Sequence, residues 1–193
     1  QAADPDFYAE TYRKIYQGAP EPTVKDLAIQ KNRAEFLIQF LDRNTIQSPS
    51  RILDVGASSG MLLAAFRDAF GGKTTGVEPG DAYRAYAESQ GLDMSPSLEA
   101  LAAADVGRYD LISMIHVLEH LPDPVGTLKM LCEELLAEGG TLLVEVPNFY
   151  AHDSYELAHL SCFSPHTLKE ILRCAGFRIK KLKRHGEPRS DLL

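Results

Sequence analysis

The segment from Arg51 to Phe70 most strongly constrains the fold, because its hydrophobic period changes across a glycine turn. Residues 52–55 form a short, largely apolar run that predicts a buried parallel strand. Gly56 and Gly60 enclose a tight turn, and the residues after it carry apolar side chains at helical spacing. A strand, a glycine turn and a helix in this order form the first half of a nucleotide-binding βαβ unit.

Strand-like and helical segments alternate through the rest of the chain. We expect helices over residues 23–41, 81–90, 97–104, 124–138 and 165–175, and further strands over 73–77, 92–94, 109–115, 141–146 and 177–185. This alternation predicts a three-layer α/β fold, with a mostly parallel central sheet and helices on both faces. Ligands bind such sheets at the carboxyl ends of the strands.

The organisation of the chain follows from these elements. We expect residues 1–45 to form an N-terminal helical cap or lid, and residues 46–193 to form the main domain. Tyr8, Tyr12 and Tyr16 give the cap an aromatic stripe, which is typical of core packing and also fits a lid over a ligand. A fold of this kind usually ends with a seventh strand, and the segment after residue 185 is too short and broken to supply it, so we expect the native chain to continue past Leu193.

Charge and cysteine content narrow the possible partners and compartments. A net charge of −7 disfavours a nucleic-acid partner, since phosphate contacts need clustered cations. The basic residues between 178 and 184 fit the solvated face of an edge strand. Three cysteines without metal-like spacing indicate a reduced, cytoplasmic protein. No apolar run approaches the length of a membrane span, so we expect no membrane partner; the oligomeric state cannot be read.

The residues expected to bind a ligand begin at the glycine turn. Gly56 and Gly60 let the backbone approach a ligand closely, and the next helix offers N–H groups and a positive dipole end. Glu78 ends the following strand, where a carboxylate can accept hydrogen bonds from both ribose hydroxyls. Asp54 occupies the place where a dinucleotide fingerprint has its first glycine, and its charge favours a cationic ligand over a pyrophosphate.

Two other motifs fit their context poorly. The segment from Gly56 to Gly60 matches the G-x-S-x-G elbow of hydrolases, but no preceding strand is available to supply the second oxyanion N–H. His116, Glu119 and His120 match H-x-x-E-H, a zinc-binding order that requires one helical face. Strand residues precede these three and prolines follow them, so we expect no metal, and we expect Glu119 and His120 to fix a turn rather than to contact a substrate.

Five segments together resemble the class I S-adenosylmethionine-dependent methyltransferases, in particular the small-molecule branch with a V-L-E-H stretch. They are LDVGASSG (53–60), GVEPG (76–80), YDLISMIHVLEHLPDP (109–124), GGTLLVEVPN (139–148) and HLSCFSPHTLKEILRCAGF (159–177). The resemblance implies a Rossmann-like methyltransferase fold, without its last strand in this sequence, and S-adenosyl-L-methionine as cofactor. It implies that the cofactor is bound by Asp54, Gly56, Ala57, Ser58, Gly60, Glu78, Pro79, Ser97, Leu98, Ile115 and His116.

Two further residues are candidates for roles in methyl transfer. His159 matches the family's histidine before F-S-P, which makes it our candidate general base, with His152 second; ordering of the loop is an equal alternative for His159. Arg33 precedes the first strand and either pairs with the cofactor carboxylate or is solvated.

We therefore expect an enzyme that methylates an oxygen, nitrogen or carbon nucleophile of a small metabolite. The first alternative is a non-catalytic cofactor-binding module of the same fold. A nicotinamide-dependent oxidoreductase is a weaker alternative, because Asp54 and the glycine spacing oppose it. The sequence does not identify the methyl acceptor.

Overall fold

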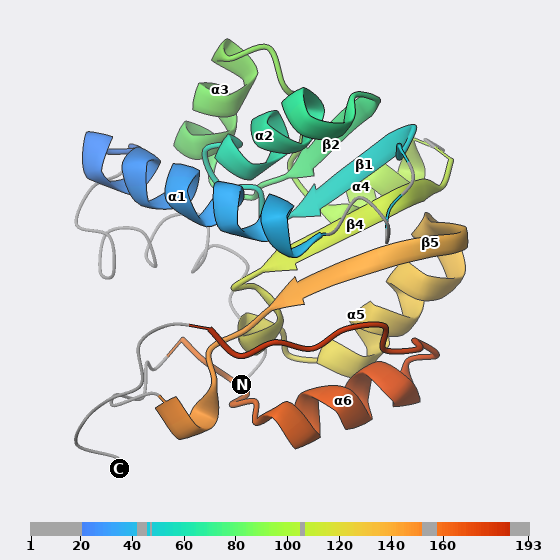
Figure 1. Ribbon diagram of the computed structural model, residues 1–193. Helices are drawn as coiled ribbons and strands as arrows, with labels where there is room; N and C mark the ends of the chain where they lie inside the picture. The colour runs from blue at the N-terminus through green and yellow to red at the C-terminus, as the bar shows by residue number, and fades with distance from the viewer. Residues whose placement is uncertain (1–20, 42–45, 47, 105–106, 152–157, 186–193) are drawn as a thin grey trace. The chain divides into compact units, whose positions relative to one another are not determined.

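The computed structural model describes residues 21–41, 46, 48–104, 107–151 and 158–185, drawn in colour in Figure 1. The chain divides into two compact units, which are taken separately here. The first comprises Gln1–Met114 with Leu135–Leu143, and the second Ile115–Glu134 with Val144–Leu193. The predicted aromatic stripe at residues 8–16 and the second candidate base, His152, lie outside the described residues.

The first unit is built on a five-stranded sheet in the order β3-β2-β1-β4-β5. The strands are β1 (Arg51–Val55), β2 (Lys73–Val77), β3 (Asp93–Ser95), β4 (Tyr109–Ile115) and β5 (Leu136–Glu145). β1 pairs in parallel with both β2 and β4, with Val55 opposite Val77 on one side and Met114 on the other. The carboxyl ends of these three strands therefore lie at one edge of the sheet.

Four helices accompany this sheet, namely α1 (Val24–Phe40), α2 (Met61–Phe70), α3 (Asp81–Ser89) and α4 (Leu98–Ala103). α1 begins with a capping box in which Thr23 and Asp26 exchange hydrogen bonds with each other's backbone N–H. α2 packs against β1 and β2, and α1 packs against α2. Apolar side chains of β1, α2 and β4 are fully buried and form the core, among them Ile52, Leu53, Leu63, Phe66, Leu111 and Ile112.

The second unit is mainly helical where it is described. It contains a 3₁₀ turn η3 (Leu118–His120), α5 (Pro124–Met130), a π-helical turn η4 (Leu131–Leu135), a second 3₁₀ turn η5 (Phe149–Ala151) and α6 (Pro165–Cys174). α5 and α6 pack against each other. Ser164 caps α6 through a capping box with Thr167, and Pro165 occupies the first turn, so the helix begins where the predicted range 165–175 begins.

The predicted Rossmann-like α/β fold, with a parallel sheet flanked by helices, is confirmed. None of the helices in the described ranges combines the length and the apolar character that crossing a membrane requires. The helix predicted over 124–138 is wrong in its last three residues, because the helix continues through the π-helical turn η4 only to Leu135 and β5 begins at Leu136. Gly139 therefore lies within the bounds of β5 rather than after a helix, with φ of +74°.

The strand predicted over residues 177–185 is also wrong, since all nine residues are described and none lies in a strand. Phe177 and Ile179 are partly buried and alternate with exposed Arg178 and Lys180, as in a strand. The alternation stops there, because every residue from 181 to 185 is exposed. A local period of two does not make a strand unless a neighbouring edge completes the hydrogen-bond ladder.

Candidate functional site

The glycine turn after β1 is held by hydrogen bonds to the end of β2. The N–H groups of Gly56 and Ala57 both donate to the carbonyl oxygen of Val77, at 2.8 and 2.9 Å. Ser58 N–H donates to Oε2 of Glu78 at 2.8 Å, and Ser58 has φ of +51°, in the left-handed region. The turn is thus folded back onto the neighbouring strand, with a conformation that is unusual for a serine.

Glu78 braces two turns at once. Its Oε1 accepts from Gly80 N–H and its Oε2 from Ser58 N–H, both at 2.8 Å, and the residue is only 2% exposed. Each carboxylate oxygen has two lone-pair directions, so each can accept more than one hydrogen bond. The sequence predicts only a ligand contact for Glu78, and no motif indicates this structural role.

Asp54 lies buried at the end of β1, with 2% of its surface exposed. Its Oδ1 accepts a 2.6 Å hydrogen bond from Ser113 Oγ on β4. Burial raises the pKa of Asp54 from 3.8 to about 7, the Ser113 hydrogen bond opposes this, and the negative charge of Glu78 adds to it. A buried carboxyl group with this pKa is well placed to interact with a ligand cation.

Gln30 of α1 is a site residue that the sequence analysis missed. Its Nε2 donates to Ser58 Oγ at 3.2 Å, and its Oε1 accepts from Ser59 Oγ at 2.6 Å. Gln30 thereby ties α1 to the glycine turn across 28 residues of sequence. Arg33 lies three residues further along α1 and so shares a helical face with Gln30, in a partly buried position.

Gly60 is required by both conformation and space. It has φ of +77°, and a Cβ there would lie 2.3 Å from Leu92 Cδ1 and 3.1 Å from Ala87 Cβ. Gly60 is also the N-cap of α2 and offers no side-chain cap. The first N–H groups of α2 therefore remain available to a ligand or solvent.

The remaining predicted cofactor residues of the first unit follow β2 and β3. Pro79 is exposed, directly after Glu78. Ser97 is the N-cap of α4, where its Oγ accepts from Ala100 N–H at 3.1 Å, and Leu98 is the first residue of that helix. Glu78 N–H donates to the carbonyl oxygen of Ser95 at 3.0 Å, which links the ends of β2 and β3.

In the second unit, His116 lies between two buried carboxylates. Its Nε2 is 3.1 Å from Oε1 of Glu145, and its Nδ1 is 3.4 Å from Oε1 of Glu119. His116 directly follows Ile115, the last residue of β4, and its φ of +54° is in the left-handed region. Such strain in a non-glycine residue persists only where its surroundings fix it, and it is frequent at functional sites.

His159 lies beside His120 at the end of the long connection after β5. The two imidazole rings have centroids 4.8 Å apart in an edge-to-face arrangement. His120 Nδ1 is hydrogen-bonded to the carbonyl oxygen of Ala158 at 2.9 Å, and Ser161 N–H donates to the carbonyl oxygen of Glu119 at 3.1 Å. The expectation that Glu119 and His120 help to fix a turn agrees with these contacts, which also hold His159 next to them.

The structure therefore brings the predicted residues together in two groups. Asp54, the glycine turn and Glu78 form a connected group in the first unit. Ile115, His116 and His159 belong to the second unit, where His116 and His159 flank the 3₁₀ turn that carries Glu119. Ser113 and Glu145 lie within the motif segments 109–124 and 139–148, but the sequence indicated no role for either, because each meets its partner only through the fold.

Comparison with known proteins gives one family. A family described as a methyltransferase domain matches residues 29–182. The ubiquinone biosynthesis O-methyltransferase of Nitrosospira multiformis is 32% identical over 116 residues, 56% of this chain and 48% of that protein. The chain spans about half the length of the curated relatives that it matches.

Two solved structures share the fold. A SAM-dependent methyltransferase from Archaeoglobus fulgidus superposes with a TM-score of 0.63 at 23% identity, over 89% of this chain and 75% of that chain. An S-adenosylmethionine-dependent methyltransferase from Clostridium acetobutylicum gives a TM-score of 0.60 at 14% identity, over 91% of this chain and 89% of that chain.

Proposed function

Because the chain belongs to the methyltransferase-domain family, we propose that it transfers a methyl group from S-adenosyl-L-methionine to a small-molecule nucleophile. The observation that carries this proposal is the hydrogen bond from Ser58 N–H to the Glu78 carboxylate, which holds that buried carboxylate against the glycine turn. A carboxylate fixed there can accept hydrogen bonds from ribose hydroxyls, while the start of α2 takes the methionine carboxylate.

The charges at this turn suit a sulfonium cofactor. Asp54 presents a carboxyl group of raised pKa beside Glu78, so the turn is acidic rather than basic. A ligand with ammonium and sulfonium groups would offset the repulsion between the carboxyl groups of Asp54 and Glu78, whereas a pyrophosphate would add negative charge to it. This contrast supports S-adenosylmethionine over a dinucleotide. We assign the cofactor contacts to Arg33, Asp54, Gly56, Ala57, Ser58, Gly60, Glu78, Pro79, Ser97, Leu98, Ile115 and His116.

The acceptor is proposed to be an oxygen nucleophile of a small metabolite. The relatives named ubiquinone biosynthesis O-methyltransferases act on oxygen by their names, which favours oxygen over nitrogen or carbon here. A net charge of −7 favours a small molecule over a nucleic acid. Free thiols at Cys132, Cys162 and Cys174 favour a reducing compartment such as the cytoplasm.

Methyl transfer from a sulfonium is an in-line displacement, so positioning of the nucleophile and the methyl group supplies much of the catalysis. A hydroxyl acceptor must also lose its proton, and His159 is our candidate for the residue on which this step depends. Its place beside His120 and Glu119 supports a chemical role. We expect His159→Ala to remove most turnover and to leave cofactor affinity unchanged.

The proposal is tested by calorimetric titration with S-adenosylmethionine, S-adenosylhomocysteine and NAD. The proteins are the wild type, Glu78→Gln, and Glu88→Ala as a matched control on exposed surface of α3. Thermal melts report whether Glu78→Gln remains folded after losing one acceptor of a backbone N–H. We expect the first two ligands to bind the wild type and the control, and to bind Glu78→Gln at least tenfold more weakly.

Binding of NAD alone would overturn the proposal and favour an oxidoreductase. Binding of both S-adenosyl compounds, without methyl transfer to any of a panel of phenols and catechols, would favour the non-catalytic module. Equal affinity of a folded Glu78→Gln variant would remove Glu78 from the cofactor site.

A further inference from the structure

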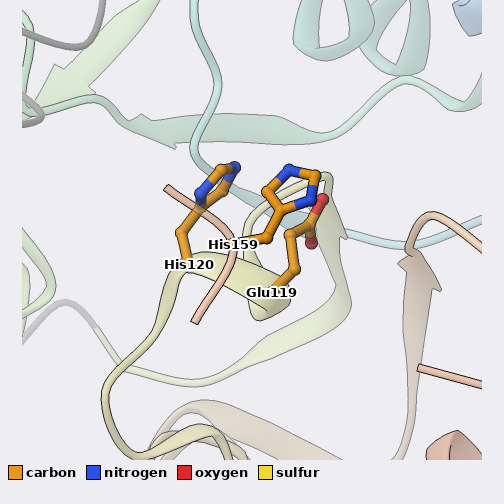
Figure 2. A group of neighbouring side chains, drawn as sticks. All are labelled: Glu119, His120 and His159. Atoms are coloured by element: carbon orange, nitrogen blue, oxygen red, sulfur yellow. The ribbon is translucent and has the colours of Figure 1, made fainter. Parts of the chain in front are cut away.

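We propose that Glu119, His120 and His159 form a binding site for a divalent transition-metal ion. One ligand atom from each residue lies within 4.8 Å of the others, and Figure 2 shows the three side chains converging. Glu119 and His120 come from η3, and His159 comes from the connection that follows η5. All three belong to the second unit, so the site is complete within one body.

The strongest sign of a missing ligand is the carboxylate of Glu119. This residue is 1% exposed, and among the described residues neither of its oxygens has a hydrogen-bond partner. His116 Nδ1 lies 3.4 Å from Oε1 of Glu119, within ion-pair distance if the imidazole is protonated. A buried carboxylate is normally satisfied by hydrogen bonds, by a cation or by a metal ion. Two carboxylate oxygens without a hydrogen bond, close to ring nitrogens of His120 and His159, favour a metal ion.

The hydrogen bond of His120 prepares its ring for coordination. The carbonyl oxygen of Ala158 can only accept, so His120 Nδ1 must be the protonated nitrogen of the pair. In the neutral ring the lone pair is then on Nε2. A metal-bound histidine characteristically donates its other ring N–H to a carbonyl or carboxylate, which fixes the tautomer and the ring orientation. Ala158 supplies this outer partner here.

The donor set indicates which ions fit. Two imidazole nitrogens with one carboxylate favour Zn²⁺, Co²⁺, Mn²⁺ or Fe²⁺ over Mg²⁺ and Ca²⁺, which prefer oxygen ligands. Donors around a tetrahedral zinc ion lie about 3.3 Å apart, so a modest side-chain rotation would close the cluster on the ion. Three protein ligands leave at least one coordination position for water or an oxygen of a bound molecule.

This inference departs from the expectation of no metal, which rested on the need for a single helical face. Glu119 and His120 lie on a 3₁₀ turn, and the third proposed ligand, His159, lies about 40 positions later in the chain. His116, the first residue of the H-x-x-E-H pattern, is not in this group and lies between Glu145 and Glu119, with Nε2 toward Glu145 and Nδ1 toward Glu119. The proposed site thus shares Glu119 and His120 with the H-x-x-E-H pattern and has His159 in place of His116.

A metal ion would also change the chemical role of His159, a consequence that rests on the proposed function. A ring nitrogen that binds the ion cannot at the same time accept the acceptor's proton. The ion would instead make a coordinated hydroxyl more acidic, and the proton would leave to solvent. In the displacement itself, the acceptor oxygen forms the new O–C bond while the S–C bond breaks and its electron pair stays on sulfur.

The test is calorimetric titration of chelator-treated full chain with ZnCl₂, and separately with CoCl₂ while visible absorption is recorded. The variants are Glu119→Gln, His120→Ala and His159→Ala. His166→Ala, an exposed histidine on α6, and Cys162→Ser, an exposed thiol three residues after His159, are the matched controls. Thermal melts verify folding of each variant, and His159→Ala keeps the His120–Ala158 bond intact.

We expect one ion per chain in the wild type and both controls, and at least a 100-fold weaker affinity in each ligand variant. Absence of stoichiometric binding to the wild type, or wild-type affinity in folded His159→Ala, would overturn the proposal. The same samples are titrated with S-adenosylmethionine. Cofactor binding without metal binding would reject the metal site alone, and metal binding without cofactor binding would reject the proposed function alone.

Discussion

Ser113 Oγ donates a 2.6 Å hydrogen bond to Oδ1 of Asp54, joining the carboxyl-terminal halves of β4 and β1 inside the core. Ser113 is fully buried and Asp54 nearly so. This bond lowers the pKa of Asp54, but desolvation raises it by more, so the pKa is about 7. Burial therefore sets the raised pKa of the Asp54 carboxyl group, and the hydrogen bond from the Ser113 hydroxyl partly offsets the cost of burying its charge.

The raised pKa of Asp54 predicts a pH-dependent stability. In the unfolded chain the group ionises near 3.8, and in the folded chain near 7, so its contribution to stability is fully present below pH 4 and is lost as the pH rises to about 7. At about 1.4 kcal/mol per pKa unit, the loss is on the order of 4 kcal/mol. Asn cannot ionise, so Asp54→Asn should gain thermal stability relative to the wild type between pH 4 and 8.

The measurement is the melting temperature as a function of pH, and exposed Asp68→Asn is the control. Parallel curves for the wild type and Asp54→Asn across this range would contradict the assignment.

The hydrogen bonds from Gln30 to Ser58 and Ser59 predict that a substitution in α1 lowers the stability of the folded chain. Gln30→Ala removes the acceptor of Ser59 Oγ, a residue only 1% exposed. Leaving a buried hydroxyl without its partner costs about 1–3 kcal/mol, or several degrees in melting temperature for a chain of this length. The exposed Gln39 on the same helix is the control, and Gln39→Ala should melt as the wild type does. Equal melting of both variants would show that the bridge has no energetic role.

The packing around Gly60 predicts a cost beyond that of its φ angle. Gly60→Ala places a Cβ 2.3 Å from Leu92 Cδ1, inside the buried cluster of Leu63, Ala87 and Leu92. Gly91 has a similar φ of +75° with nothing within 4 Å of its Cβ position, so Gly91→Ala reports the conformational cost alone. We expect Gly60→Ala to lose about 1–3 kcal/mol more than Gly91→Ala in urea unfolding. Equal losses of unfolding free energy in the two variants would mean that the Leu92 side chain moves away from the added Cβ at no energetic cost.

The position of Arg33 on the Gln30 face of α1 predicts a contribution to cofactor binding. A guanidinium can pair with the methionine carboxylate through two parallel hydrogen bonds, so Arg33→Ala should weaken S-adenosylmethionine binding about tenfold. Lys31→Ala, an exposed cation on the same helix, should bind normally. Unchanged affinity of Arg33→Ala in the calorimeter would remove Arg33 from the site.

Elements with a strong local signal were predicted well. β4 matches the predicted residues 109–115, and α1 begins at the Thr23 cap as predicted, since hydrophobic period and capping chemistry act within a few residues. The last three residues of the helix predicted over 124–138 and the strand predicted over 177–185 were wrong, because strand pairing depends on what packs alongside. The match to the methyltransferase-domain family confirms the resemblance drawn from the motifs.

The sequence by itself determined the glycine turn after a buried strand, the carboxylate at the end of the next strand and the family to which both point. Those features follow from residue types at short spacings, where steric freedom and periodicity decide the outcome. Only the tertiary structure decided that Glu78 braces Ser58, that Gln30 reaches the turn, and that Glu119, His120 and His159 meet. These contacts join residues from 20 to about 40 positions apart, and long-range packing alone sets such distances.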